Sequence, residues 1–332
     1  MNRFVRRLVV AMLLGIAVYG AFAFYTGISR MSESLARYDW STFLLALLLA
    51  SGNYGIRFFK WQYYLRRLGI TGIGAVDSLL VFLSGFVLTV TPGKVGEVFK
   101  SAVLWKTHDV PVARTAPIVV AERLTDAIGV IVLIVLGSTA FAGGLGWVLA
   151  GTFAVAAGLV AIVWERPVLS VLGRLERGQG RLARLAPRLR EAYASLRVVA
   201  GPAALLVPTS LSVVAWAAEG VAMWLILRGF HTDIALERAI FFYSTATLAG
   251  ALVPLPGGLG VVEGMIREQL VRISNVPDGP ATAAMMLIRF ATLWWAVLVG
   301  FAALAVLRLR YPQKLGDASA LAQPERSISS AR

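Results

Sequence analysis

Long apolar runs dominate the chain, and their lengths predict helices that cross a membrane. A spanning helix needs about 20 predominantly apolar residues, and six runs come close to this length. The strands of a membrane β-barrel would alternate apolar and polar side chains, and these runs do not alternate. We therefore expect an all-α polytopic membrane protein with spanning helices at 8–28, 40–64, 115–141, 147–164, 202–227 and 281–307.

Two further apolar stretches, 76–107 and 239–272, are each interrupted near the middle by prolines and glycines. Proline lacks the backbone donor that a helix interior needs, and glycine permits a turn. Each half is about 15 residues long, too short to cross a membrane. We predict two re-entrant hairpins rather than ordinary loops at helix ends, with turns formed by Pro92, Gly93, Gly96, Pro256, Gly257, Gly258 and Gly260.

Basic residues are distributed unevenly over this pattern. The chain has 32 Lys and Arg against 18 Asp and Glu, a net charge of +14. In a membrane protein such an excess indicates cytoplasmic connections and anionic lipid rather than nucleic acid. If both interrupted stretches are hairpins, every basic excess falls on one side, together with both termini. That side, the cytoplasm, then holds Arg3, Arg6, Arg7, Lys60, Arg66, Arg67, Lys106, Arg114, eight arginines between 165 and 197, Arg308, Arg310 and Lys314.

Three segments leave alternatives open. Arg6 and Arg7 before an apolar run resemble a signal peptide, but the run continues to about residue 28, which favours a retained helix. The insert 165–197 is either an amphipathic helix on the cytoplasmic leaflet or a solvated linker. Its apolar stripe consists of Leu182, Leu185, Leu189, Tyr193 and Leu196. Residues 311–332 are polar, and we expect a disordered cytoplasmic tail there.

The two interrupted stretches resemble each other at a nearly constant separation. Pro92-Gly93-x-x-Gly96 matches Pro256-Gly257-x-x-Gly260. With two extra residues in the second copy, three more residues match at a separation of 166: Glu97 with Glu263, Pro111 with Pro277, and Arg123 with Arg289. Because the predicted hairpins enter from opposite sides, we expect an inverted-topology repeat of residues 40–141 and 202–307, with a site near the membrane midplane.

Nine ionisable residues fall inside the segments that we expect in the membrane. A charge at the bilayer centre costs roughly 2.5–3.5 kcal/mol, so these side chains should face a common interior or a wet cavity. They are Lys94, Glu97, Lys100, Glu122, Arg123, Asp126, Glu219, Glu263 and Arg289. We expect all of them except Lys100 to bind a substrate. The alternative is a set of internal ion pairs that lock helices together.

Signatures of enzymes and metal sites are missing from the sequence. There is no cysteine, and we interpret His108 and His231 as solvated loop residues rather than metal ligands. Gly93-Lys94 lacks the first glycine of a P-loop, since Leu88 stands in that place. Gly258-x-Gly260 follows no strand and is not a dinucleotide fingerprint. We therefore expect no enzymatic activity, no cofactor and no metal.

Three motifs in this order resemble the flippase-like family. They are Pro92-Gly93-Lys94-x-Gly96-Glu97, then Glu122-Arg123-x-x-Asp126, then Pro256-Gly257-Gly258-x-Gly260-x-x-Glu263-Gly264. The family includes the transmembrane region of bacterial lysylphosphatidylglycerol synthases and related stand-alone membrane proteins, one of them associated with hopanoid biosynthesis. The resemblance covers roughly residues 10–310. It implies a lipid translocase fold in the bacterial inner membrane, with Lys94, Glu97, Glu122, Arg123, Asp126 and Glu263 along the headgroup path.

The sequence departs from the full synthases because no aminoacyl-transferring domain is found in it, so their substrate is not carried over. We expect a lipid flippase that moves an anionic or zwitterionic amphiphile. Arg123 and Arg289 would hold its phosphate, because the planar guanidinium fork donates two parallel hydrogen bonds. The acidic residues would hold a cationic group or a proton. The alternatives are a non-transporting accessory that partners a lipid or glycan biosynthetic enzyme, and a transporter of small solutes or ions.

Overall fold

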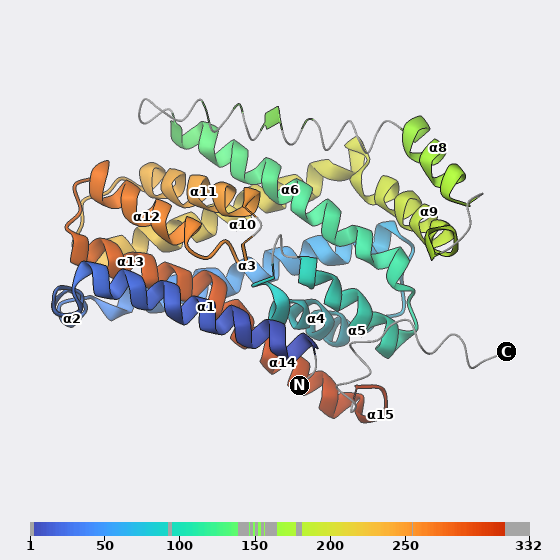
Figure 1. The fold of residues 1–332 in the computed structure, drawn as a ribbon, viewed down its shortest axis with the longest axis horizontal. Coiled ribbons are helices and arrows are strands. Elements are labelled where there is room, and N and C mark those ends of the chain that lie inside the picture. The colour runs from blue at the N-terminus through green and yellow to red at the C-terminus, as the bar shows by residue number, and fades with distance from the viewer. Residues whose placement is uncertain are drawn as a thin grey trace.

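The computed structural model is a bundle of helices, most of which run along the long axis of the molecule (Figure 1). It describes residues 3–91, 95–138, 165–176, 181–253 and 255–315, together with single positions at 146, 149, 152, 153 and 156. Helices account for nearly all of these residues, and no β-strand is found among them. The prediction of an all-α membrane protein is confirmed at this level.

The N-terminal helix turns a sharp corner. α1 (Arg3–Thr26) is followed by α2 (Ile28–Ala36), and the two helices are bent by 92° relative to each other. Gly27 lies at the corner with a φ of 90°, a conformation that glycine adopts without steric cost. α2 packs against α13 (Asp278–Arg289), so the connection expected before residue 40 is largely a docked helix.

Among the described residues, three helices are long and apolar enough to cross a membrane, or four if α1 and α2 form one bent span. The three are α3 (Trp40–Arg67), α10 (Pro202–Gly229) and the continuous run of α13, η3 (Phe290–Trp294) and α14 (Trp295–Arg310). α6 (Val112–Ser138) is similarly long but carries Glu122, Arg123 and Asp126. Apart from single positions, the predicted span at 147–164 lies outside the described residues, so the count of six stays a prediction.

Both interrupted stretches form pairs of short helices that pack against each other. In the first helix pair, α4 (Ala75–Ser84) and η1 (Gly85–Leu88) contact η2 (Val95–Val98) and α5 (Phe99–His108). In the second helix pair, α11 (Leu236–Leu252) contacts α12 (Val261–Arg272). The pairs lie toward opposite ends of the molecule (Figure 1). Pro92, Gly93 and Lys94 lie outside the described residues.

The turn of the second helix pair depends on glycine. Gly257, Gly258 and Gly260 have φ angles of 61°, 66° and 87°, in the left-handed region that a Cβ atom disfavours. A Cβ atom on Gly258 would also lie 3.1 Å from the Cα atom of Gly250 in α11. These constraints explain why glycines follow Pro256 in this turn.

Each helix pair is surrounded by its own apolar core. One core contains Trp61, Phe82 and Leu104 and encloses the first pair, whereas the other contains Met223, Phe242 and Ile288 and encloses the second. α3 and α10 share the most extensive interface between described helices and join the two cores.

The insert expected between the halves packs against the bundle. α8 (Glu165–Glu176) contacts α9 (Arg181–Ala200), which lies along α6 and buries Val199 and Ala200. Of the predicted apolar stripe, Leu189 is exposed, while Tyr193 and Leu196 are half-buried. The insert is therefore helical where it is described, and its position at the membrane surface stays a prediction.

The start of the predicted disordered tail is helical, which corrects that part of the prediction. α15 (Pro312–Leu315) buries the side chain of Leu315. Lys314 Nζ donates a hydrogen bond of 2.9 Å to the carbonyl oxygen of Thr107 at the end of α5. A polar composition alone did not indicate this docking. Residues 316–332 lie outside the described residues.

Candidate functional site

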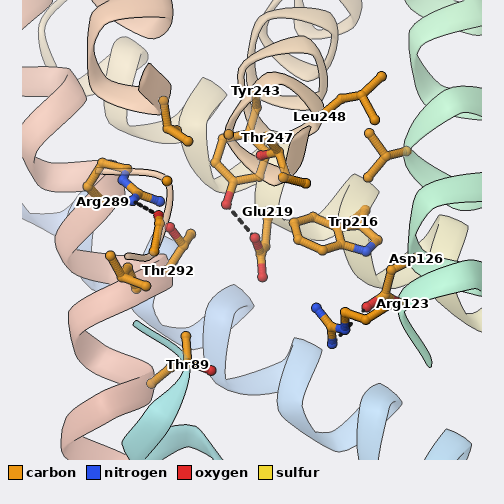
Figure 2. Close-up of a pocket in the computed structure, with 18 of the residues that line it drawn as sticks. Thr89, Arg123, Asp126, Trp216, Glu219, Tyr243, Thr247, Leu248, Arg289 and Thr292 are labelled. Carbon is orange, nitrogen blue, oxygen red and sulfur yellow. Dashed lines mark hydrogen bonds and ion pairs between the residues drawn. The ribbon is translucent and has the colours of Figure 1, made fainter. Parts of the chain in front are cut away.

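A cavity of about 230 Å³ lies where the turns of the helix pairs meet α3, α6, α10 and α13. Figure 2 shows Arg123 and Asp126 on one wall, Arg289 on the opposite wall and Glu219 between them. These four residues, out of the eight predicted to bind a substrate, line the cavity. The sequence therefore identified charged groups from both halves that converge on one space.

The other predicted residues are placed differently. Glu97 and Glu263 are buried, and each pairs with an arginine that lines the cavity. Glu122 pairs instead with Lys100, whose Nζ lies 2.5 Å from Oε2 and 4.7 Å from the centre of the Trp61 ring. That buried pair matches the alternative of internal ion pairs that lock helices together. Lys94 lies outside the described residues.

Asp126 is the centre of the charge network in the first half. Its Oδ1 atom accepts hydrogen bonds from Lys60 Nζ at 2.6 Å and from Ser212 Oγ at 2.9 Å. Its Oδ2 atom lies 3.1 Å from Arg123 Nη2. The same Nη2 atom of Arg123 donates a 3.1 Å hydrogen bond to Glu97. Such pairing offsets the large cost of removing these charges from water.

Sequence reasoning missed two cations of this network, Arg57 and Lys60. The sequence pattern assigns Lys60 to a cytoplasmic connection, but this residue is buried inside α3 with 1% exposure, so that assignment is wrong. A signal was available: Asn53, Arg57, Lys60 and Tyr64 recur at steps of four, three and four, a polar stripe along an apolar helix. Arg57 lines the cavity and lies over the ring of Phe86 at 5.6 Å.

In the second half, Arg289 fastens the turn of the second helix pair. Its Nε donates to Glu263 at 2.6 Å, and its Nη2 donates to the carbonyl oxygen of Gly257 at 2.8 Å. Glu263 also accepts the backbone N–H of Gly260 at 2.8 Å, which satisfies a free donor at the start of α12. η3, a turn of π-helix, directly follows Arg289, and such turns often occur at functional sites.

Glu219 lies where the two halves meet. It accepts a hydrogen bond of 2.7 Å from Asn53 Nδ2 and another from the hydroxyl of Tyr243. Asn53 in α3 and Glu219 in α10 are separated by 166 residues, the separation found in the repeated motifs. Two residues at this separation therefore contact each other directly.

Long apolar helices around a cavity with buried charged groups define a polytopic helical membrane protein. Residues 10–300 match the family model of the lysylphosphatidylglycerol synthase transmembrane region. The chain belongs to this family, which confirms the resemblance carried by the three motifs.

Two proteins of Methanothermobacter thermautotrophicus, each named UPF0104 membrane protein, are similar over most of their length. One is 24% identical, and the alignment covers 93% of this chain and 98% of the relative. The other is 21% identical and covers 86% and 90%.

Proposed function

We propose that this protein is a lipid translocase that moves an amphiphile with an anionic or zwitterionic head across the inner membrane. The observation that carries the proposal is a cavity lined by three guanidinium groups, those of Arg57, Arg123 and Arg289, in a chain of this family. Guanidinium groups bind phosphate through parallel, charge-assisted hydrogen bonds. Asp126 and Glu219, which also line the cavity, suit a cationic group on the same head.

Arg123 is the arginine best placed to contact a ligand. Its side chain is 24% exposed, compared with 10% for Arg57 and 7% for Arg289. The buried Nε of Arg123 has no hydrogen-bond partner among the described residues, and neither has the hydroxyl of Tyr54, which also lines the cavity. Phosphate oxygens would accept from both donors. This geometry supports a phosphate-bearing head at this wall.

Equal spacing of the ion pairs supports an inverted repeat around the cavity. Arg123 and Glu97 are 26 residues apart, and so are Arg289 and Glu263. In the first half, Arg123 on α6 bonds Glu97 in η2. In the second half, Arg289 on α13 bonds Glu263 in α12. The same two elements thus meet through the same two residue types in both halves.

Each long helix also packs against the helix pair of the other half through a glycine. A Cβ atom on Gly137 of α6 would lie 2.8 Å from the Cβ atom of Phe241, and one on Gly300 of α14 would lie 3.1 Å from that of Phe86. We therefore propose two re-entrant hairpins that enter from opposite sides, and halves that rock about the cavity to open it to each side in turn.

The proposal is tested by the movement of fluorescent lipids between the leaflets of proteoliposomes. The purified protein should move at least one lipid of a panel of phospholipids and prenyl phosphates, and Arg123→Ala should abolish this movement. Arg228→Ala is the matched control, because Arg228 is exposed and stacks over Trp224 at 5.6 Å, away from the cavity wall. No movement across the panel would contradict transport, and a co-purifying lipid or glycan biosynthetic enzyme would then favour the accessory function.

A further inference from the structure

We propose that the cavity opens sideways between α6 and α11, and that this mouth holds the acyl chains of the amphiphile whose head enters the cavity. The inference rests on the proposed function and adds the route by which a lipid reaches the site. Three observations carry it: the exposure of the lining residues, the chemistry around the mouth, and the closure of the opposite wall.

Exposure locates the mouth. Among the described residues that line the cavity, only Ala251 and Leu255, at the end of α11 and just beyond it, are exposed. The half-buried lining residues include Arg123 and Ala127 of the neighbouring α6, and the others are Thr91, Thr247, Gly257 and Thr292. Deeper lining residues such as Tyr243 and Arg289 are buried. The cavity therefore reaches the surface between α6 and the end of α11.

The chemistry changes from apolar to charged along this path. Leu255 and Ala251, the exposed lining residues, form the outer rim, whereas Arg123 is half-buried and Asp126 is buried. The surface beside the rim is also apolar, since Val120 on α6 is 50% exposed and Leu252 on α11 is 54% exposed. Exposed apolar side chains of this kind indicate contact with hydrocarbon rather than water in a membrane protein. An amphiphile fits this order, with its chains at the rim and its head at the arginine.

The opposite wall is closed by an apolar cluster and by α1. Val90, Leu259, Leu293 and Val297 pack together where the turns of the two helix pairs meet. Leu14 and Val18 of α1 pack against this cluster, and Trp294 Nε1 donates a 2.8 Å hydrogen bond to Tyr19 of α1. Since α1 lies outside the two repeated halves, it breaks their equivalence and leaves the α6–α11 side as the open one.

Neighbouring substitutions on α11 test the mouth. Ala251→Trp places an indole in the cavity mouth, whereas Leu252→Trp places the same ring on the adjacent exposed position, which does not line the cavity. Native mass spectrometry would measure the lipid retained by each purified protein, and proteoliposomes would measure lipid movement. We expect Ala251→Trp to reduce both by about tenfold relative to Leu252→Trp. Thermal unfolding in detergent would verify that both variants are folded.

A second pair of substitutions, both on α6, repeats the test from the other side of the mouth. Ala127→Trp should block lipid retention and movement, and Val120→Trp, on the exposed face of the same helix, should not. This pair keeps the test decisive if Ala251→Trp fails to fold. Titration with inorganic phosphate forms a separate arm, because a site for small anions would bind phosphate equally in all four variants.

The outcomes separate this inference from the proposed function. If the wild type moves lipid and the two mouth variants behave like their controls, the mouth is elsewhere, although the translocase proposal stands. If the wild type retains lipid that the mouth variants lose but moves none, the mouth stands and transport fails. The inference would be overturned if the wild type retains no lipid. It would also be overturned if no lipid is retained and all four variants bind phosphate as the wild type does.

Discussion

Arg123 and Arg289 lie at matching positions of the two similar motifs, 166 residues apart, yet their surroundings differ. Arg289 is 7% exposed and uses two nitrogens, one on Glu263 at 2.6 Å and one on the Gly257 carbonyl at 2.8 Å. Arg123 is 24% exposed and shares one nitrogen between Glu97 and Asp126, at 3.1 Å each. Arg289 fastens a turn, whereas the Nε of Arg123 has no hydrogen-bond partner among the described residues.

This difference leads us to propose that matching residues of the two halves have unequal roles in one conformation. The expectation that both arginines hold phosphate is therefore refined: in our account Arg123 contacts the ligand, and Arg289 holds the second turn in place. Our proposal of two inverted halves around a cavity that opens to one side predicts unequal environments for matching residues.

The largest expected effect is a difference in unfolding free energy between the two arginine variants. Arg289→Ala leaves Glu263 buried without its ion-pair partner and should cost about 3–5 kcal/mol of unfolding free energy. Arg123→Ala should cost only about 1 kcal/mol, because Glu97 keeps its hydrogen bond from Thr89 and Asp126 keeps Lys60. Denaturant unfolding in detergent measures both. Equal costs would contradict the assignment of Arg289 as an anchor.

Two buried lysines of the first half allow a second comparison, of the stability and the lipid retention of their variants. Lys100→Met removes the cation from Glu122 and should cost about 3 kcal/mol. Lys60→Met should cost less, about 2 kcal/mol, because Asp126 keeps Arg123 and Ser212. Only Lys60→Met should reduce lipid retention, since Asp126 lines the cavity and Glu122 does not. Loss of lipid in Lys100→Met alone would reverse this assignment.

Two glycines of the second turn should respond unequally to alanine. Both have positive φ angles, so each substitution costs about 1–2 kcal/mol of backbone strain. A Cβ atom on Gly258 would also meet Val262 Cγ2 at 3.0 Å and Gly250 Cα at 3.1 Å, whereas nothing lies within 4 Å of one on Gly260. Gly258→Ala should therefore lower the unfolding midpoint further than Gly260→Ala. The reverse order would argue against the close approach of α11 to the turn.

The smallest expected effect concerns the starts of the two central helices. The side chain of Asp39 caps α3, whereas α10 begins after Gly201 with no side-chain cap. Hydrogen bonds from the Ser41 hydroxyl and backbone N–H lower the pKa of Asp39. A lowered carboxyl pKa stabilises the fold above the ordinary pKa of about 3.9, and this stability is lost as the pH falls through the lowered value.

Asp39→Ala should therefore be slightly less stable than wild type at pH 7, and this gap should close in strong acid. Thermal unfolding of both proteins across the pH range measures it. Gly201→Asp is the complementary variant, because it tests whether a cap can be added to α10. A gap that does not change with pH would show that the carboxylate of Asp39 is not the capping group.

Much of the fold was predictable because long apolar runs determine it. The spans expected at 40–64, 115–141 and 202–227 correspond to α3, α6 and α10, with ends that differ by a few residues. The docking of α2 and α15 was not predictable, since a short polar helix shows no apolar run and binds through tertiary contacts such as that of Lys314. Residue composition does not predict such tertiary contacts.

The sequence made it possible to predict which residues belong to the site, but not the role of each residue. A charged residue inside an apolar run is visible in sequence, and four such residues line the cavity. Lys60 was misplaced because it lies near the end of its run. The polar stripe on its helix was visible in the sequence, but its partner Asp126, 66 residues away, was not. Whether an arginine fastens a turn or faces a ligand depends on packing that no single segment contains.

The opposite orientation of the two halves is the central claim, and single-cysteine labelling tests it most directly. The chain has no native cysteine, and Pro111 and Pro277 are exposed residues at equivalent positions, one before α6 and one before α13. A membrane-impermeant maleimide should label Pro111→Cys only from the cytoplasmic side and Pro277→Cys only from the opposite side. Labelling of both cysteines from the same side would contradict the inverted repeat.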